Sequence, residues 1–271
     1  MEKSPPMNPR DLTAQIEQAP TLPGGDAERF RGYGVMALPF RSGHILGLRR
    51  FPASSIGPGY TSVWHRDPAG SWTFYTDVAP QLSCNRYFGA GVDAVHECPI
   101  ALTWTGPERF AVTTGEGSLT WDVNLRLTSV ARTLSAVCSR LPGWLWTQGP
   151  VLTAMGAVGG FALRAGNISL RGRTSNGQEF AANPLRIWTI PTSRAIVGGV
   201  DLGAVGPIPE QTRLGDFWLP QRGLFIIGQV YMEQFDPARH LNKTFRTDTG
   251  FMDIQPSGGR HAQGSLPAHS Q

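Results

Sequence analysis

Four side chains have the types and the spacing to move protons: His65, Tyr75, Asp77 and Asp122. A histidine, tyrosine or carboxyl group that faces a cavity can protonate a bound ligand when its pKa suits the task. Tyr75 and Asp77 are two residues apart, so on a strand they would share one face and could point into one cavity. We predict these four as candidate catalytic residues. A solvated strand face is the alternative for Tyr75 and Asp77, and an outward polar face is the alternative for Asp122.

His65 lies in "VWHRDPAGSWTFYTD", residues 63–77, which has the pattern of a β-hairpin. Polar and apolar residues alternate on both sides of Asp67-Pro-Ala-Gly, which is a strong turn signal. Asp67 is expected to cap its own turn, so His65 is the residue beside the turn that carries a chemical hypothesis. The alternation also predicts that Trp72 and Tyr75 lie on opposite faces of the second strand.

The sequence predicts no metal site at its histidines and cysteines. His65, Cys84 and the run His96-Glu97-Cys98 offer suitable ligands, but their spacing matches no zinc pattern. The glycine clusters do not lead from a strand into a helix as G-x-G-x-x-G requires, and neither a P-loop nor a G-x-S-x-G elbow occurs. We therefore predict no metal and no cofactor.

The charge pattern argues against nucleic-acid binding. The chain carries 24 basic and 20 acidic residues, a formal net charge of +4. All the basic residues except Lys3 and Lys243 are arginines, and they are scattered, with no basic block that contains aromatic residues. The three cysteines form no disulfide framework and the first residues lack the apolar run of a signal peptide, so we expect a cytoplasmic location.

The composition favours many short strands. Of 271 residues, 40% are hydrophobic and 16% charged, and Gly (33) and Pro (22) together exceed a fifth, which is typical of a turn-rich β protein. The turn of one hairpin is predicted about Asn176-Gly177, as a type I′ turn. Alternating polar and apolar residues predict strands or hairpins over 60–77, 99–115, 118–128, 167–190, 193–203 and 222–235.

Between the two groups of strands, residues 128–163 are predicted to form a helical, apolar insert. Over 128–141 apolar residues recur at helical spacing, with Thr128 or Ser129 as N-cap and Pro142-Gly143 as stop. The next stretch, 141–163, has no charged residue and reaches the length of a membrane span, but Pro150 would break a single helix. Three interpretations stay open for it: a transmembrane helix, a buried element that caps the β structure, and a lid that touches the membrane surface.

These patterns predict a mainly β protein, an antiparallel barrel or sandwich in two β segments, 27–127 and 164–249, on either side of the insert. The two segments could each form an incomplete barrel or could close together. The polar ends, 1–26 and 250–271, are predicted to be disordered.

The Trp-bearing strands resemble those of uncharacterised bacterial proteins related to the tandem-lipocalin (calycin-like) superfamily, which includes carotenoid 1,2-hydratases. The resemblance rests on "DPAGSWTFYTD" early, "SLTWDVNLRL" at the end of the first segment, and a second β segment behind it; it covers roughly residues 35–235. It implies a lipocalin-like barrel with an internal cavity for an apolar, isoprenoid-like or lipid-like molecule. Some relatives add acid-catalysed hydration or cyclisation, but no catalytic residue can be carried over onto a matching motif here.

We therefore predict that the protein binds or handles an apolar small molecule in a β cavity. Peripheral membrane contact through 141–163 is one route by which such a ligand could enter. Two alternatives stay open: an enzyme that hydrates, isomerises or cyclises the ligand with the four candidates above as proton donors, and a structural or partner-binding module. The predicted ligand-binding residues are Trp64, Trp72, Trp104 and Trp121.

Overall fold

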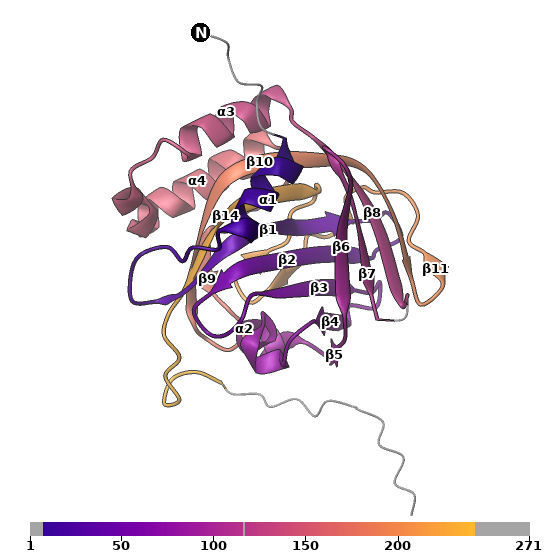
Figure 1. Cartoon of the computed structure of the whole chain (residues 1–271), viewed down its shortest axis with the longest axis horizontal. Coiled ribbons are helices and arrows are strands. Elements are labelled where there is room, and N and C mark those ends of the chain that lie inside the picture. The colour runs from indigo at the N-terminus through magenta and orange to yellow at the C-terminus, as the bar shows by residue number, and fades with distance from the viewer. Residues whose placement is uncertain (1–7, 116, 242–271) are drawn as a thin grey trace, which may run out of the picture.

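The computed structural model describes residues 8–115 and 117–241, and its main element is one large, curled β-sheet (Figure 1). In spatial order its strands are β5 (Ala94–Glu97), β4 (Trp72–Thr76), β3 (Tyr60–Arg66), β2 (Ile45–Ser54), β1 (Glu28–Pro39), β14 (Leu224–Met232), β10 (Glu179–Val197), β8 (Leu119–Arg126), β7 (Arg109–Thr114) and β6 (Ile100–Gly106). Two further short strands, β9 (Arg171–Arg173) and β11 (Val200–Asp201), pair with β10. A separate small sheet consists of β12 (Arg213–Leu214) and β13 (Phe217–Trp218).

The protein is mainly β, as predicted, but its sheet is mixed rather than antiparallel. The exception is the edge strand β5, which runs parallel to β4. The chain between them passes through three short helices, η1 (Pro80–Leu82), α2 (Asn85–Phe88) and η2 (Gly89–Gly91). A crossover of this kind returns the chain to the same end of the sheet, which is what a parallel pair requires.

The two β segments close together into one half-barrel. The last strand of the second segment, β14, pairs with β1, and β10 pairs with β8. The strands β10 and β14 therefore lie between the two halves of the first segment. The sheet path ends at β5 and β6, and this arrangement does not confirm the lipocalin-like barrel.

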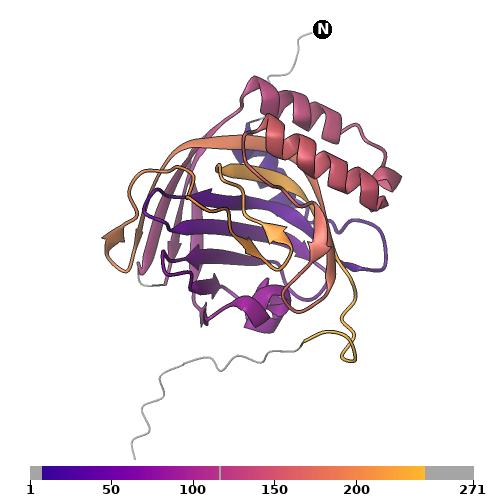
Figure 2. The same ribbon diagram turned by 180° about the vertical axis from the view of Figure 1, so that it is seen from behind.

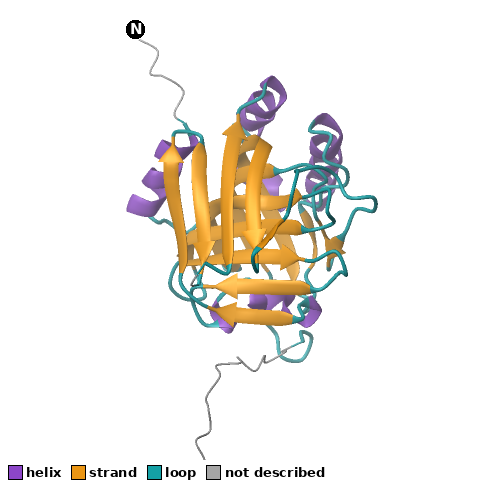
Figure 3. Cartoon of the chain, turned by 90° about the vertical axis from the view of Figure 1, so that its right-hand side faces the viewer, coloured by secondary structure: helices purple, strands orange, loops and turns teal. Residues whose placement is uncertain are grey.

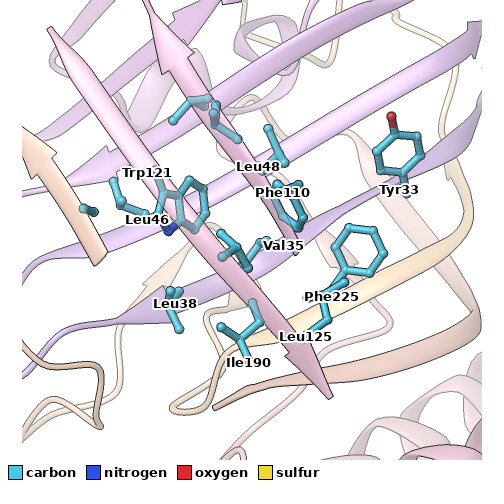
Figure 4. Packing of buried hydrophobic residues seen from close by; sticks show 14 of the residues in the cluster. Tyr33, Val35, Leu38, Leu46, Leu48, Phe110, Trp121, Leu125, Ile190 and Phe225 are labelled. Atoms are coloured by element: carbon cyan, nitrogen blue, oxygen red, sulfur yellow. The ribbon is translucent and has the colours of Figure 1, made fainter. Parts of the chain in front are cut away.

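The concave side of the half-barrel holds one apolar core. Strands β6, β7 and β8 cross over β1, β2 and β3 (Figures 1 and 3), and side chains from both groups fill the space between them (Figure 4). Val35, Leu48, Phe110, Trp121 and Phe225 are each at most 1% exposed there. In β8, buried side chains alternate with more exposed ones, which is why the sequence of 118–128 predicts a strand so clearly.

Helix α1 (Pro9–Gln18) lies against the concave side, within the segment 1–26 that we predicted to be disordered. Asn8 caps it by accepting a hydrogen bond from the backbone of Asp11 at 3.0 Å, and Pro9 begins the helix. Ile16 reaches the concave core. The buried apolar contact and the cap outweigh the polar composition of the segment, so residues 9–18 are helical. Residues 1–7 and 242–271 lie outside the described residues, and with them the predicted disordered tail.

The convex side of the sheet holds a second, more aromatic core. This core contains Trp64, Trp72 and Phe74 of the sheet, Phe88 of α2 and Phe217 of β13. Trp64 and Phe74 stack with ring centres 4.5 Å apart. The sheet is thus buried on both sides near β2 and β3, which explains the unbroken burial of Tyr60–His65 in β3.

The helical insert contains α3 (Ser129–Cys138), η3 (Gly143–Thr147) and α4 (Gly149–Ala162), packed outside β10 and β14 (Figure 2). Thr128 caps α3 as predicted, accepting from the backbone of Ala131 at 3.2 Å. Pro150 lies in the first turn of α4, where its missing N–H costs nothing. Within the described residues, no helix is both long and apolar enough to cross a membrane.

Three predicted hairpins are confirmed, β3 with β4, β6 with β7 and β9 with β10, the last with a different turn. Asp67 caps the turn between β3 and β4 with its carboxylate, 2.8 Å from the backbone nitrogen of Ser71. The hairpin of β9 and β10 closes about Asn176-Gly177, but only Gly177 of that pair has a positive φ, so the turn is not type I′. Asn176 is held instead by tertiary contacts, since its amide donates to the backbone oxygen of Arg86 at 3.0 Å.

Candidate functional site

His65 is buried and pairs with His44, which is partly exposed. Its Nε2 lies 2.9 Å from Nδ1 of His44, and the two rings stack with centres 5.2 Å apart. Burial, and then the proximity of His44, lowers the pKa of His65 to about 4, and Asp67 offsets this only in part. His65 is therefore neutral at pH 7, whereas the proton-donor role that we predicted would need the imidazolium.

Tyr75 and Asp77 lie on the side opposite Trp72, as the alternation predicted. Tyr75 packs against the concave core and stacks on His96 with ring centres 5.4 Å apart. Burial raises the pKa of Tyr75. The carboxylate of Asp77 accepts a hydrogen bond of 2.7 Å from the backbone nitrogen of Thr61. Asp77 therefore fixes the end of β4 against β3.

Asp77 and Trp104 both line the α1 cleft, an open groove of about 500 Å³ between α1 and the concave side. Glu17 also lines the cleft, and its carboxylate accepts two hydrogen bonds from Arg50, at 2.9 and 2.7 Å, and one from the Tyr33 hydroxyl at 2.8 Å. Burial opposes ionisation of Glu17, but these hydrogen bonds outweigh it and lower its pKa. The ion pair of Glu17 and Arg50 thus ties α1 to β2.

The remaining predicted residues do not converge on one site. Asp122 is exposed, opposite Arg194 on the neighbouring strand. Trp121 lies in the concave core, where its Nε1 donates to Ser193 at 2.8 Å, while Trp64 and Trp72 lie in the convex core. The four predicted ligand-binding tryptophans are therefore divided between the two sides of the sheet.

A different cavity lies beneath the helical insert, and we call it the insert cavity. It has a volume of about 210 Å³ and separates α3 and α4 from the convex side of β1, β10 and β14. Helix α3 contributes residues at the helical spacing seen in the sequence, while Gly159 of α4 has open space where a Cβ would point. Its lining consists of Met36, Leu134, Val137, Cys138, Ala154, Met155, Val158, Gly159, Leu163, Ile168, Leu170, Pro184, Ile187, Leu224 and Ile226.

The glycines of α4 explain how the helix closes the cavity. A Cβ at Gly156 would collide with the carbonyl oxygen of Ile168, and one at Gly160 with that of Gly166. These two residues, which have the small-xxx-small spacing of a membrane helix pair, instead let α4 approach the backbone of 166–170. Residues 141–163 thus include a helix that caps the β structure.

A smaller hollow of about 90 Å³, the Arg49 chamber, adjoins the insert cavity. The two share four lining residues, which are Met36, Leu170, Pro184 and Ile226. Arg49 is the charged residue of this chamber. Its guanidinium lies 4.5 Å from the ring centre of Trp64 and 5.4 Å from that of Phe217, and burial lowers its pKa to about 10.

The insert cavity could be found only in part from the sequence. The apolar spacing of α3 and the uncharged stretch 141–163 pointed to its helical wall. The opposite wall, with Met36 and Ile226, depends on which strands stand side by side, and β1 and β14 are almost 200 residues apart in sequence. Within the part of the chain that the structure describes, no group of three or more His, Cys, Asp or Glu side chains could hold a metal ion.

Comparisons with known proteins place few constraints on the chain. No protein-family model matches it, and neither does any curated protein. Among solved structures, it is weakly similar to an acetoacetate decarboxylase from Legionella pneumophila subsp. pneumophila str. Philadelphia 1, with 11% sequence identity and a TM-score of 0.35 over 86% of this chain and 97% of that chain. A likeness of this strength carries no argument about function, and the lipocalin resemblance is not shown.

Proposed function

We propose that the protein binds an apolar small molecule of the lipid or isoprenoid class in the insert cavity. The observation that carries the proposal is the lining of this cavity, in which every residue is apolar, counting the thiol of Cys138 as a small hydrophobe. Cavities lined in this way do not hold water well and take up apolar ligands instead. Its neighbour, the Arg49 chamber, extends the space available to a ligand.

The exposure of the lining supports the same function. The cavity of about 210 Å³ is partly open to solvent, since Val137 and Val158 of its lining are 52% and 59% exposed. A bound apolar molecule would cover this lining and remove it from water, which favours binding by about 25 cal/mol per Å² of apolar surface buried.

Binding without catalysis is the function that the geometry supports best. None of His65, Tyr75, Asp77 and Asp122 lines the insert cavity. Hydration, isomerisation or cyclisation of a ligand held there would need another proton donor close to it. The enzyme and the structural or partner-binding module therefore stay secondary hypotheses.

We also propose that the insert touches an anionic membrane surface, from which the ligand enters. Five of the eight large hydrophobic residues that are exposed in the described chain lie on the insert, and two of them, Val137 and Val158, also line the cavity. Trp144 is 63% exposed and Phe161 89%, although Trp146, also in η3, is buried. Residues 123–178 contain six arginines and no acidic residue. Exposed apolar side chains among basic ones suit the surface of an anionic bilayer.

Organic extraction of the purified full chain, followed by mass spectrometry, tests the binding proposal. We expect an apolar compound to co-purify with the wild type. Gly159→Leu should abolish this, because the new side chain enters the cavity, while Ala157→Leu, at an exposed position of the same helix outside the cavity, should retain the compound. Equal amounts of the compound in the two variants would contradict the proposed site.

A further inference from the structure

Among the described residues, Arg49 is a partly buried cation without an acidic partner. Its sequence neighbour Arg50 points to the opposite side of the sheet and pairs with Glu17 at 2.7 Å. Within the described residues, no carboxylate lies within ion-pair distance of Arg49. Even partial removal of a charge from water is unfavourable without a counter-ion, so the lack of one beside an apolar chamber calls for an explanation.

The hydrogen bonds of Arg49 leave part of its guanidinium available. Nη1 donates to the backbone oxygens of Val35 and Leu48, and Nη2 donates to that of Met36 at 3.0 Å. A guanidinium has five N–H groups. Within the described chain, therefore, Nε and one N–H of Nη2 have no protein acceptor. These two nitrogens share one edge of the group, and such an edge matches the two oxygens of a carboxylate.

A second polar group in the Arg49 chamber also lacks a partner. Asn183 lines the chamber, is only 3% exposed, and has no hydrogen-bond partner for its Oδ1. The oxygen and nitrogen of an amide exchange places when the group turns over, so Asn183 can present an N–H to an anion. The rest of the chamber is largely apolar, and its small volume suits a compact head group.

We infer that the ligand is an amphiphilic monocarboxylic acid, whose carboxylate binds Arg49 while its apolar chain occupies the insert cavity. This inference rests on the proposed function and names the class of its ligand. The two hollows are adjacent, since they share Met36, Leu170, Pro184 and Ile226 as lining residues, and the inference places one molecule across both. Trp64 and Phe217 support the guanidinium in the position where the carboxylate arrives.

Calorimetric titration of the delipidated full chain with dodecanoate and with methyl dodecanoate, at pH 8, tests the inference. The two compounds have the same chain, but only the acid carries a charge. We expect the acid to bind the wild type at least about tenfold more tightly, as is usual for a charge-assisted hydrogen-bonded pair. Arg49→Met should remove this preference, and Arg194→Met, an exposed arginine away from the chamber, should keep it.

The outcomes separate the inference from the proposed function. Equal affinity of the wild type for acid and ester would overturn the inference and leave the apolar site standing. Binding of neither compound would overturn both. Should Arg49→Met fail to fold, the comparison of acid and ester on the wild type decides alone, and Arg49→Lys, which keeps the charge but loses the paired donors, should retain part of the preference.

Discussion

The guanidinium of Arg49 lies over the indole of Trp64, 4.5 Å from the ring centre, so a partly buried cation rests on a buried ring on the convex side of the sheet. We predicted Trp64 as a ligand-binding residue. It lines neither the insert cavity nor the Arg49 chamber. Its position beneath Arg49 gives it a supporting role, in which it holds the cation that faces the chamber.

Replacement of Trp64 is expected to destabilise the protein strongly. The side chain is 1% exposed and contacts Phe74, Phe88 and Arg49. Trp64→Leu should lower the free energy of unfolding by about 3 kcal/mol, since the smaller side chain leaves a void in a close-packed core. Phe161→Leu, at a residue that is 89% exposed, should change it by less than about 0.5 kcal/mol. Urea denaturation of both variants measures the difference, and similar losses would contradict this packing.

The glycines of α4 are expected to respond to alanine in opposite directions. Gly159→Ala should stabilise the protein by up to about 1 kcal/mol, because the new methyl group meets open space and alanine favours the helix. Gly156→Ala and Gly160→Ala should destabilise it, because each methyl group would collide with a carbonyl oxygen. Thermal unfolding of the three variants tests this order. A stabilising change at Gly160 would show that α4 does not pack against 166–170 as described.

Acid should weaken the fold through His65. Its pKa in the folded protein is about 4, below the ordinary value of 6.5, so the unfolded chain binds more protons between these pH values. The contribution of His65 to the free energy of unfolding is therefore fully present above about pH 6.5. It is lost as the pH falls toward 4, which lowers the free energy of unfolding by on the order of 2 kcal/mol after allowance for solvent screening. His65→Gln should show a flatter dependence between pH 5 and 6.5, measured by urea denaturation. Parallel curves for variant and wild type would contradict the pKa shift.

Membrane contact should depend on the exposed apolar residues of the insert. The variant Trp144→Asp/Phe161→Asp is expected to bind vesicles that contain phosphatidylglycerol at least about tenfold more weakly than the wild type, since it loses the burial of two aromatic side chains. The matched control is Val200→Asp/Leu241→Asp, which changes two exposed residues outside the insert. Co-sedimentation with these vesicles and with neutral ones measures binding. A wild type that never pellets with anionic vesicles would remove the membrane proposal.

Local patterns predicted the elements that local interactions specify. The hairpin of β3 and β4 depends on Asp67 capping its own turn, and α3 depends on Thr128 and on its apolar spacing, all within a few residues. Helix α1 carried a comparable signal in Asn8-Pro9, but its stability also depends on Glu17 meeting Arg50, 33 residues away. The polar composition of residues 1–26, with several prolines around Asn8-Pro9, predicts disorder instead.

The candidate site needed the tertiary arrangement. The strand alternation correctly separated Trp72 from Tyr75, but alternation cannot say which side of a sheet meets a ligand. Arg49 and Arg50 are adjacent in sequence and lie on opposite sides of the sheet. Arg50 pairs with Glu17, and Arg49 faces an apolar chamber. That contrast appears only when β1, β2, β10 and β14 are placed side by side.

Methyl resonances of the methionines offer the most direct test of a ligand in the insert cavity. Met36 and Met155 line the cavity from opposite walls, while Met232 is buried elsewhere, in the convex core. On titration of protein carrying ¹³C-methyl methionine with dodecanoate and, separately, with its methyl ester, we expect the resonances of Met36 and Met155 to shift and saturate while that of Met232 stays in place. In Gly159→Leu these shifts should be lost. Unchanged resonances of Met36 and Met155 at saturating ligand, or a shift at Met232 alone, would contradict the proposed site.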